Sequence, residues 1–164
     1  MKKSVLFVLL SPLLGCAPAY VVPQNTSTAI VNVDHVGQHP SSSTIDVFSA
    51  PKCEKQFFLG ELADVGTNID LKKSATGKIE ANKVAYFSGT RHWAIPEAGL
   101  EKWCSLMFSF TPKQDAVYSV NVTGSGYSAC SVEVFENGSK EKPSDLQIYP
   151  LDRICLGDSI HYEK

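Results

Sequence analysis

Hydrophobic and polar residues alternate most regularly in the second half of the chain. Three segments, 103–110, 116–123 and 127–136, place apolar side chains at every second position. This period of two is typical of β-strands that bury one face and expose the other. The apolar positions are Cys104, Leu106, Phe108, Phe110, Tyr118, Val120, Val122, Cys130, Val132 and Val134.

Shorter segments of the same kind extend this pattern along the whole chain. Turn-forming residues separate them, notably Gly124-Ser125-Gly126 and Asn137-Gly138, the second of which is a strong hairpin signal. Only residues 96–102 allow one helical turn. The pattern predicts an all-β fold, an antiparallel β-sandwich of about seven to nine short strands. The expected strands are 28–34, 43–49, 55–59, 78–88, 103–110, 116–123, 127–136, 145–149 and a short 153–156.

The N-terminus carries the features of an export signal. Lys2 and Lys3 precede an almost unbroken apolar run over residues 4–14. A run of about eleven residues is too short to span a bilayer, which takes roughly 20. No later segment is longer, so we expect no transmembrane helix.

The apolar run ends in Leu13-Leu14-Gly15-Cys16, which resembles the lipobox of bacterial lipoproteins. The resemblance implies cleavage before Cys16, acylation of that residue, and a membrane-bound product, because two or three acyl chains make attachment durable. Ala17 stands where an inner-membrane retention signal would have Asp, which implies an outer-membrane location. The alternative is an ordinary secretory signal with a chance cysteine. The expected organisation is a signal peptide (1–15), a lipidated tether (16–28) and a β-sandwich domain (29–164).

Four further cysteines, Cys53, Cys104, Cys130 and Cys155, predict two disulfides in an exported chain. Three pairings are possible, and we favour Cys53–Cys104 with Cys130–Cys155 because these close the shorter loops. No C-x-x-C motif is present and no histidine lies close to a cysteine pair, so a zinc site is not expected.

Charge argues against a nucleic-acid partner. Loss of Lys2 and Lys3 leaves 13 basic residues against 17 acidic ones, without the basic stripe that nucleic acid requires. A hydrophobic content of 43% is ordinary for a folded domain.

The run from Cys104 through Phe108, Phe110 and Tyr118 to Cys130 is similar to small envelope lipoproteins with transthyretin-like or immunoglobulin-like sandwiches. The resemblance covers about a third of the domain. It implies an accessory or structural role in envelope machinery.

Arg91-His92-Trp93 is the most distinctive polar-aromatic cluster, and it is the candidate recognition surface because Trp and Arg are favoured interface anchors. The alternative is structural, with Trp93 packing over the sheet edge and Arg91 stacked on it. His35 and His39 are expected in a flexible surface loop rather than in a metal site. The acidic pair Glu61 and Asp64 is expected to be solvated loop charge.

No catalytic motif is present: there is no Gly-x-Ser-x-Gly elbow and no phosphate-binding glycine loop before a helix. We therefore expect a non-catalytic binding or scaffold module, held on the membrane by lipid and docking on an envelope protein, with no cofactor or metal. The alternatives are a small-ligand carrier, or an envelope hydrolase with His92 or His161 as the base.

Overall fold

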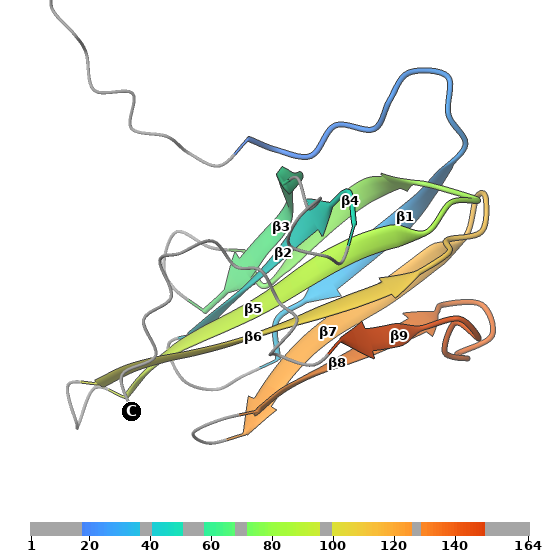
Figure 1. The fold of residues 1–164 in the computed structure, drawn as a ribbon. Helices are drawn as coiled ribbons and strands as arrows, with labels where there is room; N and C mark the ends of the chain where they lie inside the picture. The colour runs from blue at the N-terminus through green and yellow to red at the C-terminus, as the bar shows by residue number, and fades with distance from the viewer. Residues whose placement is uncertain are drawn as a thin grey trace, which may run out of the picture.

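The computed structural model describes residues 18–36, 41–50, 58–67, 72–95, 100–125 and 129–149 (Figure 1). These residues form strands and connections and include no helix, which confirms the predicted all-β class. The strands are β1 (Thr28–Asp34), β2 (Ser41–Phe48), β3 (Phe58–Gly66), β4 (Ser74–Glu80), β5 (Ala85–Ile95), β6 (Leu100–Phe110), β7 (Val117–Ser125), β8 (Ala129–Glu136) and β9 (Gln147–Tyr149). Within these residues, no helix is long and apolar enough to cross a bilayer.

The strands form two sheets. One has the order β4-β1-β7-β8 and the other β3-β2-β5-β6-β9. All pairings between named strands are antiparallel except that of β1 with β7, which is parallel. The longest pairing joins β5 to β6 without a register shift, from Ala85 opposite Phe110 to Ile95 opposite Leu100.

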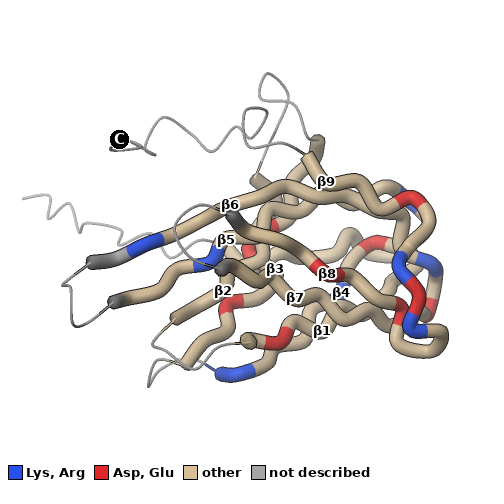
Figure 2. Tube along the Cα trace, turned by 90° about the horizontal axis from the view of Figure 1, so that it is seen from below, with Lys and Arg blue, Asp and Glu red and all other residues tan. Residues whose placement is uncertain are grey.

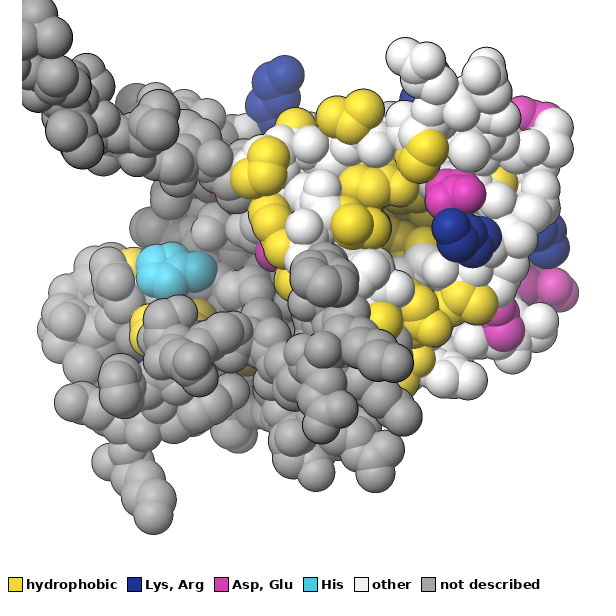
Figure 3. All heavy atoms as spheres, turned by 45° about the horizontal axis from the view of Figure 1, so that its top comes forward, with side chains coloured by type: hydrophobic (Ala, Val, Ile, Leu, Met, Phe, Trp, Pro, Cys, Tyr) yellow, Lys and Arg dark blue, Asp and Glu magenta, His cyan; other side chains and the backbone are white. Residues whose placement is uncertain are grey.

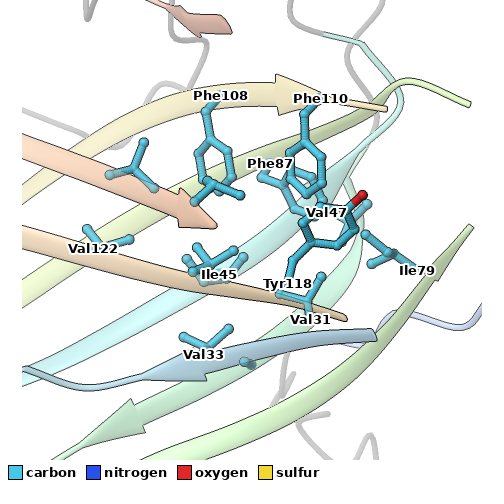
Figure 4. Close-up of a cluster of buried hydrophobic side chains, with 14 of the residues drawn as sticks. Val31, Val33, Ile45, Val47, Ile79, Phe87, Phe108, Phe110, Tyr118 and Val122 are labelled. Carbon is cyan, nitrogen blue, oxygen red and sulfur yellow. The ribbon is translucent and has the colours of Figure 1, made fainter. Parts of the chain in front are cut away.

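Both sheets contribute to one hydrophobic core (Figure 4). The alternating residues of β6, β7 and β8 point into it as the sequence predicts, and Phe108, Phe110 and Val122 are completely buried. Phe87 stacks on Phe110 at 5.4 Å between ring centroids, and Phe110 contacts Tyr118 at 4.9 Å. Since Phe110 and Tyr118 belong to different sheets, these aromatic contacts hold the sheets together at one end of the strands.

The disulfide between the sheets is not the one that we favoured. Cys104 on β6 is bonded to Cys130 on β8, with their Cα atoms 5.6 Å apart. Both cysteines lie on the apolar faces of their strands, and the two faces meet, so the pair is close in space although 26 residues apart in sequence. The favoured Cys53–Cys104 and Cys130–Cys155 pairing is therefore wrong. Cys53 and Cys155 lie outside the described residues, as do Cys16 and His161.

The single strand expected over residues 78–88 is two strands in different sheets. Asn82 adopts φ 62° between them, a left-handed conformation that asparagine tolerates better than most residues. β4 ends before it and pairs with β1, whereas β5 begins after it and pairs with β2 and β6. The continuous apolar pattern concealed this change of sheet.

The Asn137-Gly138 turn does not close a hairpin either. The strand before it, β8, pairs with β7, and the next strand, β9, pairs with β6 in the other sheet. Here the turn carries the chain from one sheet to the other. β7 and β8 are antiparallel neighbours as predicted, but Gly124 and Ser125 lie in β7, opposite Cys130 and Ala129, and not in the turn.

The start of the segment expected to be a tether pairs with the domain. Glu61 N donates to Pro18 O at 2.9 Å, and Tyr20 N donates to Glu61 O at 2.8 Å, so this backbone lies along the free edge of β3. Gly60 makes the approach possible: its φ is 147°, and a Cβ atom there would lie 2.5 Å from the Cα of Tyr20. Tyr20 and Glu80 of β4 also line one hollow, so the segment lies against both sheets.

The disulfide predicts a specific digestion product. Without reductant, trypsin should yield peptide 103–113 joined to peptide 114–140, and mass spectrometry should find the same pair in a Cys53→Ser variant. Free Cys104 in that variant would contradict the structure.

Because the bond closes a 26-residue separation, the Cys104→Ala/Cys130→Ala variant should lose about 3.5 kcal/mol of unfolding free energy, measured by denaturant titration.

Replacement of Gly60 by alanine should release residues 18–20 from β3, because the new Cβ collides with the backbone of Tyr20. Hydrogen exchange should accelerate at the Tyr20 and Glu61 amides. Gly138→Ala is the matched control, since a Cβ at Gly138 meets nothing within 4 Å. Equal protection of both amides in the two variants would show that Gly60 is not required for this docking.

Candidate functional site

The structure does not bring Arg91, His92 and Trp93 together on one surface. Arg91 is opposite Cys104 on β6 and shares its core-facing side of the sheet, whereas His92 lies on the outer side. Trp93 is on the same side as Arg91 and is partly buried. The alternation of β5 thus separates the central histidine from its neighbours, and a recognition role for His92 or Trp93 stays a prediction.

Arg91 joins the two sheets. It is 8% exposed, and its guanidinium donates from Nη1 to Val122 O at 3.1 Å and from Nη2 to Val36 O at 2.7 Å. Val122 belongs to β7 in the opposite sheet and Val36 follows β1. Burial lowers the pKa of Arg91 below its ordinary value. Two carbonyl partners compensate for removing the guanidinium from water, which makes Arg91 a structural residue.

His35 lies near Arg91 and is bonded to the polar side chains of β2, so it is not in a free loop. Its Nε2 lies 2.8 Å from Ser41 Oγ and its Nδ1 lies 3.3 Å from Ser43 Oγ. Its backbone N donates to Lys73 O at 2.9 Å. Desolvation and, to a lesser extent, the positive charge of Arg91 lower the pKa of His35 below 6.5. His39 lies outside the described residues.

The close contact of His35 with Ser41 has the geometry of a base and a nucleophile. Ser41, however, is only 2% exposed. A polymer substrate cannot reach its hydroxyl in this conformation. Within the described ranges there is also no group of three or more His, Cys, Asp or Glu side chains placed to hold a metal ion.

A carboxylate cluster lies on the outer side of the five-stranded sheet. Asp46 on β2 is opposite Glu61 on β3, with Asp64 nearby. Desolvation and then repulsion from Glu61 and Asp64 raise the pKa of Asp46 to about 6. Because the pKa of Asp46 is higher in the folded state than in the unfolded state, its protonation contributes to the stability of the fold. This contribution is complete below about pH 4 and is lost as the pH rises through about 6. Glu61 and Asp64 are thus strand residues that interact, not solvated loop charge.

Trp103 is an exposed aromatic residue that the sequence pattern did not single out as a candidate. It is 50% exposed on β6 and is the cross-strand partner of His92 on β5. Tryptophan contributes more than most residues when a partner covers it. The sequence did contain a signal for its exposure: Trp103 directly precedes the core-facing Cys104 on the same strand, which places Trp103 on the outer face.

An apolar patch lies where the N-terminal segment meets the sheets. We define it by four exposed residues, Val21, Phe58, Leu59 and Val84. Leu59 and Val84 line a hollow of about 150 Å³ together with Tyr20 and Phe48. Figure 3 shows hydrophobic side chains gathered around this hollow, beside one acidic and one basic side chain.

A larger hollow of about 390 Å³ lies among the turns after β6 and β8. Its lining includes several charged side chains, among them the ion pair of Lys113 with Glu136, at 2.7 Å. Figure 2 shows acidic and basic residues gathered together at the turns at this end of the molecule. The mixture of opposite charges there gives no preference for a ligand of one sign.

No protein-family model matches the sequence, and no curated protein is similar to it. The interpretation of these surfaces therefore depends on their own geometry and chemistry.

The lowered pKa of His35 predicts a stability that falls in mild acid. A folded-state pKa below the unfolded one means that the contribution is complete above pH 6.5 and is lost as the pH falls through the folded value. His35→Gln should remove this component, a change below about 1 kcal/mol after solvent screening. Denaturant titrations at several pH values between 4.5 and 7.5 should show it as a difference between wild type and variant. Parallel pH profiles would contradict the assignment to His35.

Proposed function

We propose that this chain is a lipid-anchored, non-catalytic binding or scaffold module of the cell envelope. The observation that carries the proposal is the half-exposed Trp103, paired with His92 on the outer face of the five-stranded sheet. Ser41, which contacts His35 with the geometry of a nucleophile and a base, is buried and bonded within the fold. Arg91 is buried and bonded as well. A binding role uses what the surface presents, and the buried polar residues contribute to rigidity.

The proposed architecture is a β-sandwich of the transthyretin-like or immunoglobulin-like kind. The shared core and the Cys104–Cys130 bond between the sheets support it. If the domain has a second disulfide, Cys53 and Cys155 form it, since they are the remaining cysteines after the proposed acylation of Cys16. An oxidised, doubly bridged domain fits an exported protein.

The proposed location is the outer membrane, through acyl chains on Cys16. The charged start, short apolar run and lipobox support the anchor, and Ala17 supports the destination. Ligand carriage between the sheets is less well supported, because the side chains of Phe87, Phe108 and Val122 fill that space and are fully buried.

A photo-crosslinking amino acid at Trp103 should capture an envelope protein in intact cells. The matched control is the same amino acid at Glu133, which is exposed on the outer side of the other sheet. We expect a discrete adduct from position 103 only, and its loss in a Cys16→Ser background, in which the protein no longer fractionates with membranes. Absence of any adduct at 103, or equal adducts at both positions, would contradict a binding face there. Unchanged membrane fractionation of Cys16→Ser would contradict the anchor.

A further inference from the structure

We infer that the apolar patch of Val21, Phe58, Leu59 and Val84 lies against the surface of the bilayer that holds the lipid anchor. This inference rests on the proposed acylation of Cys16. It adds an orientation, because it states which side of the domain contacts lipid.

The first argument is the length of chain between anchor and fold. Pro18 is already bonded to β3, since its carbonyl accepts from Glu61 N at 2.9 Å. Only Ala17 separates Pro18 from Cys16, and two residue steps reach at most about 7 Å. The acylated residue is therefore held beside the edge of β3, and the domain cannot rotate freely around a long tether.

The second argument is the composition of the surface around that edge. Leu59 is two residues from Glu61 and is 46% exposed, and Val84 is equally exposed across the shared hollow. Val21 directly follows the bonded segment and is 78% exposed. Phe58 contacts Phe48 ring to ring at 5.6 Å, which fixes its position beside the hollow. Contact with the lipid interface removes such apolar surface from water.

The third argument is charge. Glu80 and Lys83 also line the hollow, and they neutralise one another at 3.4 Å. Among the described residues that line the hollow, Glu80 is the one carboxylate and Lys83 compensates it, so this part of the surface approaches lipid headgroups at little electrostatic cost. At about 150 Å³ the hollow is also below the usual size of a small-molecule site, which favours a broad, shallow contact.

Depth-dependent fluorescence quenching tests the orientation. The acylated protein carrying Val84→Trp is reconstituted into phosphatidylethanolamine–phosphatidylglycerol vesicles that contain brominated acyl chains. The control is Val36→Trp. Val36 is also an exposed valine, at 53%, but it follows the C-terminal end of β1, whereas the patch lies beside the segment that precedes β1. Trp93 and Trp103 are present in both proteins, so the difference from wild type reports the added residue.

Quenching of the tryptophan added at position 84 should be several-fold larger than at position 36. Val21→Trp provides a second probe of the patch and should behave like Val84→Trp if the latter misfolds. Equal quenching at the patch and at position 36, or none at either, overturns the inference. Intact-mass measurement of Cys16 distinguishes failure of the anchor from failure of the orientation. An unacylated protein contradicts both the proposed anchor and this inference. An acylated protein whose patch is not quenched contradicts this inference alone.

Discussion

The central constraint on this fold is that each sheet has one apolar face, and the two faces must be buried against each other. Phe87, Phe108, Phe110 and Tyr118 satisfy this at one end of the strands with large rings. At the other end the core is polar, and two different bonds replace the missing aromatic contacts. Arg91 and Cys104 are direct cross-strand neighbours on β5 and β6, and each crosses to the opposite sheet. Arg91 bonds to the backbone of β7, and Cys104 bonds covalently to β8.

This arrangement explains why period-two patterns predicted much of the fold. Local alternation fixes which side chains face the core, and burial in β7 and β8 follows it closely. In β6 it does not, because Ser105, Met107 and Ser109 on the other face are buried as well. The same rule places Arg91 inside, since it lies four residues after Phe87 on β5, but the expected strand ends at residue 88 and does not include it. Asn82 shows what local alternation cannot predict. A single left-handed residue moves the chain to another sheet without disturbing the apolar pattern.

Other features depend on contacts between distant segments, which no local pattern encodes. The Cys104–Cys130 bond follows from how the sheets stack, and loop length alone favoured a different pairing. The position of His35 depends on two serines of the next strand, and its own neighbours suggested a loop. Gly60 offered a weak signal, since a glycine inside a strand often marks a close backbone approach, here by Tyr20.

The two proposals together restrict how a partner can approach. Val84 immediately precedes β5, whose first residue, Ala85, pairs with Phe110. Trp103 is seven residues from Phe110 along β6, which is about 24 Å at the usual rise of an antiparallel strand. With the apolar patch on lipid, Trp103 is separated from it by most of the length of the sheet. A protein that covers Trp103 then contacts the domain well away from the anchor, so docking and anchoring use separate surfaces. The fold between them has to be rigid for the anchor to control the position of the partner, and Arg91 with the Cys104–Cys130 bond supplies that rigidity at the end nearer to Trp103.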